Sequence, residues 1–455
     1  MKLISQFKNK YNKITYKTYQ TENGMKVLHL DNPATTNFDF AIVHNAGAAY
    51  EDEEKVPRGT AHFLEHMLLN PNETFQSKDE INKFEQGSIK RPAIYINAFT
   101  NKKYITFTGN GNEKGKMRIL KRLESIYQFP KQKFADQIEK ERGIILAEKS
   151  RKLKKENDNY LASLDFLFED TQKEFTGDVL GEPEDIRNIT IDNLESYFFS
   201  RITHKDTVMA IQSNGELSNG VTRKIEKISR EMTNNDKEDF RIVTLDNSFR
   251  VGSFSEERLN GINVSFIYFE KDQKDIDYKK HNLKFIYAKL LEWLAFEILR
   301  EKKSLIYGFS PFRTSSTSFD YNMYGCRFTT EKEKVKETIN ELYEILYKTS
   351  FEFLKEEKGR EWFEDVISTY IFPKTTVYDE TLAENISPKL LKHQELFNYN
   401  IAVKEAKKIT IKDLEEYIKK QLRIPPNIWL ESDMPKEEMI KIIKESPFNK
   451  EFSKK

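Results

Sequence analysis

The chain has 455 residues, of which 38% are hydrophobic, and this is enough apolar surface to form a core, so wholesale disorder is excluded. Lysine and arginine number 74 against 73 acidic residues, a balance that does not indicate a globally basic nucleic-acid-binding protein. The length predicts at least two domains, and no apolar run approaches the roughly 18 residues of a membrane-spanning helix.

The single cysteine, Cys326, excludes an intrachain disulfide and a structural zinc site built from cysteine pairs. A lone cysteine is more often a small buried hydrophobic residue than a catalytic thiol. The N-terminus carries five lysines before its first acidic residue, Glu22, and has no apolar signal core. Because arginine is absent there, a basic lead-in to a strand is favoured over a transit peptide, and the expected location is the cytoplasm.

The first half of the chain predicts a mixture of strands and helices. Asn23 and Gly24 form a favoured hairpin turn, so residues 14–30 are expected to form a hairpin. The elements expected after it are a strand within 38–48, helices at 60–70 and 77–87, strands within 93–111, helices at about 113–128 and 131–155, a strand at 207–217 and a helix at 221–232.

The second half repeats this order of elements at a spacing of about 230 residues, without repeating the sequence. It predicts a strand at 258–270, a long helix at 282–303, strands within 306–330 and two further helical regions. This grouping favours an α+β fold of two similar halves, each an antiparallel-rich sheet with helices packed on one face. The expected division is an N-terminal domain at 1–232, a polar linker at 233–248 and a C-terminal domain at 249–455.

Two of the seven histidines, His62 and His66, lie four residues apart on a predicted helix, with Glu65 between them. That spacing puts both imidazoles on one face of the helix, as two ligands of one metal ion require. The order H-x-x-E-H is typical of a class of zinc peptidases, and chance gives it in about one such chain in a hundred. The alternative is a pair of ordinary hydrogen-bonded histidines on a half-buried amphipathic helix.

A catalytic zinc site needs a third protein ligand and one open position for water. Glu141 and Glu148 are seven residues apart on a predicted helix, so their carboxylates lie on one face. The residues between them include Ile144, Ile145 and Leu146, which indicates burial, and a buried carboxylate needs a partner. A zinc ion would be such a partner, and salt bridges to nearby basic side chains are the alternative.

The chain resembles the insulinase/pitrilysin-type zinc metallopeptidases in four motifs that occur in the order of that family: HFLEH (62–66), NAFT (97–100), ERGIILAE (141–148) and VLGEPEDI (179–186). In the second half, Arg300 and Tyr307 resemble the Arg…Tyr element of the family. The likeness spans residues from about 20 to 310, and several motifs in one order make it specific. The length resembles the half-length, two-domain members, which are bacterial peptidases similar to mitochondrial processing peptidase.

The resemblance implies a role for each matching residue. One Zn²⁺ ion per chain would be held by His62, His66 and Glu148, with Glu65 as the general base. Glu141 would orient one of the ligands from behind. The substrate would be contacted by the edge strand Asn97, Ala98, Phe99 and Thr100 and by Arg300 and Tyr307, of which Tyr307 would donate to the developing oxyanion.

The sequence departs from the family pattern in two places. The spacing from His66 to Glu148 is longer than usual, and we expect the extra residues in the loop at 86–94. Ser304 stands where the family commonly has glycine. The second half has no H-x-x-E-H, since the corresponding helix carries Leu290 and Leu294 in place of the histidines, so that half is expected to bind no metal.

The resemblance also implies an assembly and a function. Chains of this length form half of a clamshell, and two pair so that the Arg…Tyr element of one serves the zinc site of the other. A homodimer is therefore expected, with a heterodimer of related chains as the alternative, and no nucleic-acid or membrane partner. The expected function is a zinc endopeptidase that hydrolyses unfolded peptides bound as an added β-strand in an enclosed chamber. The alternatives are a non-catalytic structural or partner subunit of the same fold and an unrelated helical binding protein with a chance motif.

Overall fold

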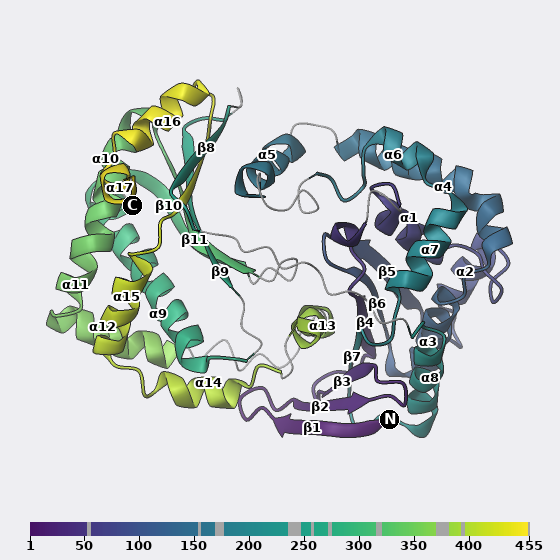
Figure 1. The fold of residues 1–455 in the computed structure, drawn as a ribbon. Coiled ribbons are helices and arrows are strands. Elements are labelled where there is room, and N and C mark those ends of the chain that lie inside the picture. The colour runs from purple at the N-terminus through teal and green to yellow at the C-terminus, as the bar shows by residue number, and fades with distance from the viewer. Residues whose placement is uncertain are drawn as a thin grey trace. The chain divides into compact units, whose positions relative to one another are not determined.

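The computed structural model of the chain describes residues 1–51, 56–152, 156–168, 177–234, 247–255, 259–271, 275–314, 321–369, 382–392 and 396–453. These residues fall into two compact units, each built on its own sheet (Figure 1). The first unit comprises Met1–Asp158, Gln172–Ile242 and Thr375–Asn398. The second unit comprises Asn159–Thr171, Val243–Lys374 and Tyr399–Lys455.

The first unit contains a seven-stranded sheet in the order β1-β2-β3-β7-β4-β6-β5. Neighbouring strands are antiparallel except β3 and β7, which are parallel. The strands are β1 (Lys2–Lys8), β2 (Thr15–Gln20), β3 (Lys26–Asp31), β4 (Asp39–His44), β5 (Ile94–Thr100), β6 (Ile105–Gly111) and β7 (Thr207–Ser213). The predicted hairpin at 14–30 is confirmed as β2 and β3, and the strands predicted within 93–111 as β5 and β6.

Helices cover one face of this sheet and share a hydrophobic core with it. They are α1 (Thr60–Leu68), α2 (Lys78–Glu85), α3 (Lys116–Ile126), α4 (Lys131–Lys152), α6 (Pro183–Asn188), α7 (Ile191–Arg201) and α8 (Asn219–Arg230), with short 3₁₀ turns at Ala48–Tyr50 and Glu113–Gly115. Phe40 and Phe107 of the sheet belong to the same buried cluster as Phe63 of α1 and Phe134 of α4. The helices that carry the candidate site are therefore part of the core.

The second unit has a five-stranded sheet in the order β10-β11-β9-β12-β8, in which only β12 and β8 are a parallel pair. Its strands are β8 (Arg250–Ser255), β9 (Ile262–Lys271), β10 (Ile306–Thr314), β11 (Tyr321–Thr330) and β12 (Asn427–Ser432). Its helices are α9 (Tyr278–Ala295), α10 (Val335–Glu344), α11 (Ser350–Phe353), α12 (Glu357–Thr369), α14 (Tyr399–Ala406), α15 (Ile411–Gln421), α16 (Lys436–Lys444) and α17 (Pro447–Phe452), with π-helical segments at Phe296–Lys302 and Ile345–Thr349 and a 3₁₀ turn at Lys332–Lys334. The α+β prediction of two similar halves is confirmed.

Two helices pack in the unit built mainly from the other half of the sequence. Helix α13 (Leu382–Lys392) lies on the first sheet, where Ala383 and Leu390 join Leu28 and Leu30 of β3 in a second buried cluster. Since successive strand residues face opposite sides, this cluster lies on the sheet face away from α1. The prediction places helices on one face of the sheet, and α13 on the other face departs from it.

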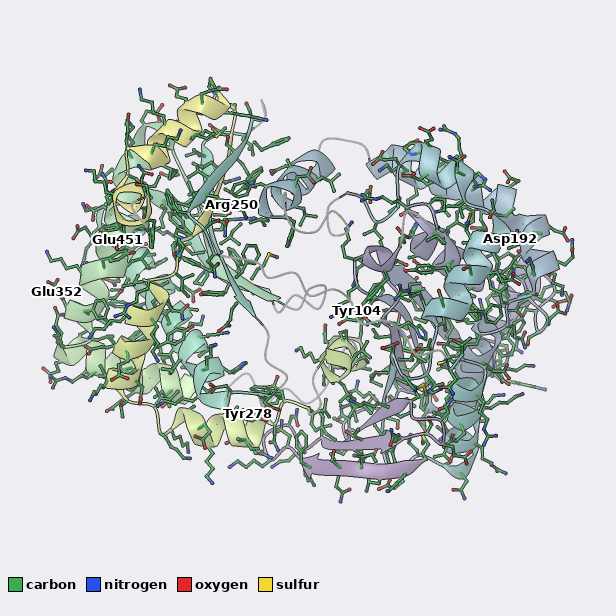
Figure 2. All side chains as sticks on the ribbon, in the orientation of Figure 1. Tyr104, Asp192, Arg250, Tyr278, Glu352 and Glu451 are labelled. Carbon is green, nitrogen blue, oxygen red and sulfur yellow. The ribbon has the colours of Figure 1, made fainter. Side chains whose placement is uncertain are left out.

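Helix α5 (Glu156–Phe168) makes the reciprocal contact in the second unit. The Phe166 ring packs on Trp429 of β12 with centroids 5.3 Å apart. Arg250 of β8, labelled in Figure 2, places its guanidinium 5.2 Å from the Phe166 ring and donates to the carbonyl of Leu167. The chain-order division into residues 1–232 and 249–455 did not anticipate this exchange, and most of the predicted linker lies outside the described residues.

Cys326 lies on β11 and is buried in the core of the second unit, as the interpretation of a small hydrophobic residue predicts. Burial raises the pKa of its thiol to about 12, so the reactive thiolate is scarce at neutral pH. Within the described residues, none of the helices combines the length and hydrophobicity needed to cross a bilayer.

The burial of one histidine in the first sheet should make the stability of the protein depend on pH. Burial lowers the pKa of His29 to about 4, and its Nε2 lies 3.0 Å from the Ser213 hydroxyl. The unfolded chain therefore binds a proton more readily, and stability falls as the pH drops from about 6.5 to about 4. We expect this residue to remove about 3 kcal/mol of unfolding free energy over that range. Urea unfolding at about pH 6.5 and about pH 4 should show a smaller fall in unfolding free energy for His29→Gln than for wild type. A fall as large as that of wild type would contradict the assignment to His29.

Candidate metal centre

Helix α1 presents His62, Glu65 and His66 from the helix predicted at 60–70. His62 and Glu65 are buried and His66 is partly exposed. The two imidazole rings lie side by side, with centroids 4.6 Å apart and planes at 64°. One helical turn thus brings two nitrogen ligands to one place, as the spacing of four predicts.

Helix α4 brings Glu148 to both histidines. Its Oε2 lies 3.8 Å from Nε2 of His62 and 3.6 Å from Nε2 of His66. One ligand atom from each of the three side chains lies within 4.8 Å of the others. A tetrahedral zinc ion with bonds of about 2.0–2.1 Å separates its ligand atoms by roughly 3.3 Å. Two nitrogens and one oxygen at these separations fit a catalytic zinc ion with a fourth position for water.

Glu141 lies behind His66, on the side away from Glu148. The Nδ1 of His66 donates to Oε2 of Glu141 at 3.4 Å, which leaves the lone pair on Nε2, the atom that faces Glu148. Burial disfavours the charged form of His66, but Glu141 and the charges of Glu65 and Glu148 outweigh it, so its pKa is raised.

The carboxylate of Glu141 is itself held by more than His66. Burial acts to raise its pKa, but hydrogen bonds from His66 and Asn70 and the charge of Lys78 outweigh this, so the pKa lies below its usual value. Asn70 stands two residues after the end of α1 and is buried. It was not singled out from the sequence, because an asparagine just after a helix most often only ends it.

Glu65 points toward the end of β5. The hydroxyl of Thr100 donates to Oε2 of Glu65 at 3.0 Å. Strand β5 pairs with β6 and ends the strand order of the sheet, so Asn97, Ala98, Phe99 and Thr100 lie on an edge strand, as expected. The predicted loop at 86–94 lies between α2 and β5, and Ile89 within it is fully exposed.

The N-terminus of α1 is capped by a side chain from an earlier segment. Gly59 stands at the N-cap with a φ of +89° and has no side chain to cap the helix. Glu51 caps the helix instead, because its side chain accepts from the backbone N–H of Gly59 at 2.9 Å and of Ala61 at 2.7 Å. Burial raises the pKa of Glu51 to about 8. Sequence reasoning missed this role because Glu51 opens a run of acidic residues that reads as a solvated loop.

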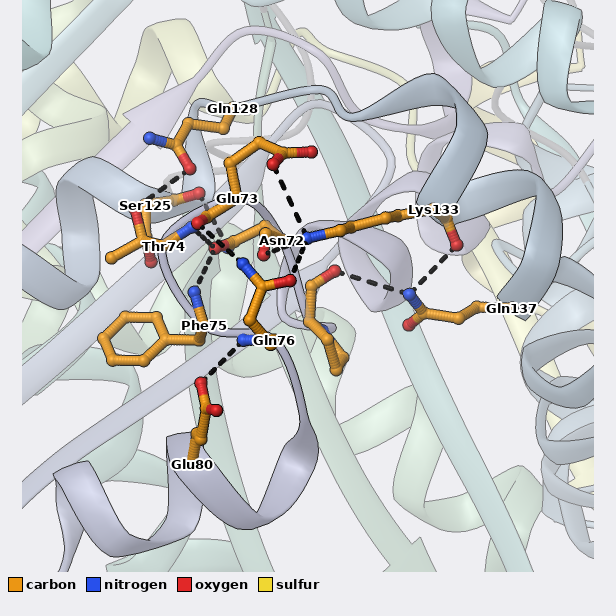
Figure 3. Close-up of polar contacts among 11 residues, drawn as sticks. Asn72, Glu73, Thr74, Phe75, Gln76, Glu80, Ser125, Gln128, Lys133 and Gln137 are labelled. Atoms are coloured by element: carbon orange, nitrogen blue, oxygen red, sulfur yellow. Dashed lines mark hydrogen bonds and ion pairs between the residues drawn. The ribbon is translucent and has the colours of Figure 1, made fainter.

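The loop that follows α1 is tied to α3 and α4 (Figure 3). The Asn72 side chain accepts from the N–H groups of Thr74 and Phe75 and donates to the carbonyl of Ser125 in α3 at 2.9 Å. Lys133 of α4 donates to the carbonyl of Asn72 at 3.1 Å. The helix that carries the histidines is thus held at both ends.

Replacing each of two glycines near the site by alanine should have opposite effects on stability. An alanine Cβ at Gly59 would lie 2.2 Å from the carbonyl oxygen of Leu180, and its φ of +89° disfavours any side chain. We expect Gly59→Ala to lower the unfolding free energy by at least about 2 kcal/mol. Gly143 in α4 has nothing within 4 Å of its Cβ position, so Gly143→Ala should raise stability by about 0.5–1 kcal/mol. Urea unfolding of the metal-free variants measures both; equal effects would contradict the close approach at Gly59.

Arg300 and Tyr307 belong to the second unit. Arg300 lies in the π-helical segment, and its guanidinium is 4.8 Å from the ring centre of Phe296 and 5.7 Å from that of Tyr307. Tyr307 is 86% exposed at the start of β10. Ser304 between them has a φ of +49°, the left-handed region that favours glycine. The position therefore keeps the backbone that a glycine would give.

Family models and individual proteins match this chain. Residues 26–176 match the insulinase family (peptidase family M16), and residues 188–357 match the domain described as the peptidase M16 inactive domain. The chain is 27% identical over 192 residues to a probable mitochondrial-processing peptidase subunit beta of Arabidopsis thaliana, covering 41% of this chain and 34% of that protein. It is 24% identical over 256 residues to the probable zinc protease PqqL of Haemophilus influenzae, covering 50% and 25%. The chain therefore spans only about a third and a quarter of the length of these two curated relatives.

Solved structures share the fold across almost the whole chain. The first half of the periplasmic protease PqqL from Escherichia coli superposes with a TM-score of 0.75 at 15% identity, covering 99% of this chain and 98% of that one. A protease from Helicobacter pylori gives a TM-score of 0.67 at 16% identity, covering 94% and 100%. The two matched family regions follow one another and together cover most of the sequence, so this chain belongs to the insulinase family, peptidase family M16.

Proposed function

We propose that the chain is a zinc-dependent endopeptidase that hydrolyses unfolded peptides. The observation that carries the proposal is the group of His62, His66 and Glu148, with Glu65 on the same helix turn as the histidines. A non-catalytic subunit of the same fold has no need of this combination. Within the family, the function follows from the site and not from the fold alone.

Each side chain of the site has a part in the proposed mechanism. His62, His66 and Glu148 would hold the zinc ion, which when bound polarises a peptide carbonyl and lowers the pKa of water toward about 7. Glu65 takes a proton from the attacking water and returns it to the nitrogen of the leaving amine. The Thr100 hydroxyl holds Oε2 of Glu65, and Glu141 keeps His66 in the tautomer whose Nε2 is unprotonated.

The substrate would bind along β5 as an added antiparallel or parallel strand. An edge strand offers main-chain hydrogen bonds to any extended peptide, so recognition depends little on sequence and requires an unfolded substrate. The exposed side chains of Tyr95 and Asn97 line this edge. Since Thr100 at its end touches Glu65, a peptide paired with β5 would run toward the general base.

We further propose that two chains pair and that Arg300 and Tyr307 of one chain act at the zinc site of the other. Support comes from length, since the chain covers 51% of the full periplasmic protease PqqL and 47% of pitrilysin. Each of those chains is therefore about twice as long as this one. Light scattering should give twice the mass of one chain. The mass of one chain for an active sample would contradict the pairing.

Tyr307→Phe should lower kcat by about 100-fold and leave KM and the melting temperature unchanged, because one donor to the oxyanion is lost. Tyr307 is 86% exposed, so its hydroxyl has no part in the core of the second unit. Tyr343→Phe in α10 is the matched control, with the same atom removed elsewhere in that unit. A wild-type kcat for Tyr307→Phe would refute the role.

The proposed activity is tested with a pool of unstructured peptides and one tightly folded protein of similar size. We expect the peptides to be cleaved at internal bonds and the folded protein to remain whole. A zinc chelator should stop the cleavage, and added Zn²⁺ should restore it. A folded, zinc-loaded dimer that cleaves none of the peptides would favour the alternative, a partner subunit that works with a related chain.

A further inference from the structure

We propose that the turn at residues 177–182 positions the zinc ligands relative to one another, with Lys149 as the positioning residue for Glu148. The turn overlaps the VLGEPEDI motif, which none of the proposed catalytic roles uses. The inference rests on the proposed function, since it assigns to this turn the geometry of the proposed zinc site.

Lys149 fixes the orientation of α4 next to the ligand Glu148. Its side chain is 2% exposed, and its Nζ lies 3.1 Å from Oδ2 of Asp178 and 3.1 Å from Oε1 of Glu182. A buried ammonium group needs such partners, so this contact holds one angular position of the helix. Successive helical residues are about 100° apart, and fixing Lys149 therefore fixes the direction in which Glu148 leaves the helix.

Asp178 serves the turn and the helix with different oxygens. Its Oδ1 accepts from the N–H of Leu180 at 3.1 Å, and its carbonyl accepts from the N–H of Gly181 at 3.2 Å, which closes the turn. Its Oδ2 accepts from Nζ of Lys149. The helix α4 is thus held against a closed turn that has its own internal hydrogen bonds.

The same turn lies directly against the start of α1. A Cβ on Gly59 would be 2.2 Å from the carbonyl oxygen of Leu180, and a Cβ on Gly181 would be 2.3 Å from the carbonyl oxygen of Arg58. Both glycines have positive φ, +89° and +75°. Backbone meets backbone here, so the turn sets where α1 begins and hence where His62 lies, one turn further along.

A third contact joins the turn to the substrate strand. The buried side chain of Lys102, between β5 and β6, donates to the carbonyl of Gly177 at 2.8 Å. Lys102 stands two residues after Thr100, which donates to Glu65. One short turn is therefore in contact with the three segments that supply the histidines, the third ligand and the partner of the general base.

The test uses the full-length chain and measures zinc binding itself. Lys149→Met alone removes a positive charge beside Asp178 and changes the net charge of the contact, so the key variant is the charge-balanced Lys149→Met/Asp178→Asn, in which this ion pair is absent. The matched control is Ile225→Ala in α8, a core substitution in the same unit on a helix that packs mainly against α3. Circular dichroism and the melting temperature of the metal-free proteins report folding for both variants.

We expect competition with a chromophoric chelator to show zinc binding weakened about 10–100-fold in the double variant and unchanged in Ile225→Ala. At saturating zinc, kcat should fall in the double variant while KM stays near the wild-type value. If the double variant binds zinc as tightly as wild type with the same kcat, or if Ile225→Ala weakens zinc equally, the inference is wrong. If the wild-type chain itself binds no zinc, the proposed function fails instead.

Discussion

Glu65→Gln is expected to lower the rate of peptide cleavage by about 100- to 10,000-fold while zinc binding stays at the wild-type level. Glutamine has nearly the same shape and still accepts the hydrogen bond from Thr100, so the helix and the two histidines keep their positions. The amide cannot take a proton from water, and this is the step that Glu65 is proposed to perform. Metal analysis together with a peptide cleavage assay measures both quantities.

Glu184→Gln is the matched control for this variant, because Glu184 is exposed on α6 and the same charge is removed away from the site. It should cleave peptides at the wild-type rate. An active Glu65→Gln enzyme would remove Glu65 from the role of general base, even with the rest of the site intact.

The second large effect is expected for Glu148→Gln, which should weaken zinc binding by more than about 100-fold and abolish cleavage at low zinc concentration. The Oε2 of Glu148 lies within 3.8 Å of the Nε2 atoms of His62 and His66. Since the two imidazoles bind zinc in their neutral form, Glu148 supplies the negative charge of this ligand set. A neutral amide oxygen is a poorer ligand for Zn²⁺ than a carboxylate. Excess zinc should restore part of the activity, because Glu65 and Glu141 remain.

Glu139→Gln on the same helix is the control, since its side chain is 76% exposed and pairs with Arg142. It should bind zinc as wild type does. A Glu148→Gln protein with unchanged zinc affinity would mean that the third ligand has been assigned to the wrong residue.

Local patterns in the sequence predicted those parts of the fold that local physics decides. The turn at Asn23 and Gly24, the helix that carries His62 and His66, and the paired strands on either side of residues 101–103 all appear as expected. Each depends on the spacing of apolar residues or on the preference of two turn residues, both of which are visible within about ten positions.

Long-range packing could not be predicted in the same way. Helix α13 is an amphipathic segment that fits any apolar sheet face, and nothing in its sequence indicates the face formed by Leu28 and Leu30. Strand β12 joins its sheet from the far end of the chain, next to β8 and β9, so its partners are set by the tertiary fold. Contacts of this kind have no local signal.

The candidate site likewise has features with a local sequence signal and features without one. The spacing of four between the histidines is local, whereas the separate roles of Glu141 and Glu148 came from the resemblance to a family. The structure puts Glu141 at Nδ1 of His66 and Glu148 at the two Nε2 atoms. The contributions of Glu51 and Lys149 depend on distant backbone groups, and their immediate sequence reads as ordinary charged surface.

The most direct measurement is the rate of peptide cleavage by metal-free protein as zinc is added stepwise. We expect no cleavage without metal, a linear rise with added zinc and a sharp break at one equivalent per chain, with the fold unchanged throughout by circular dichroism. Cleavage that persists in the metal-free protein, or a fully zinc-loaded wild-type dimer without activity toward any unstructured peptide, would contradict the assignment of a zinc peptidase site to His62, His66 and Glu148.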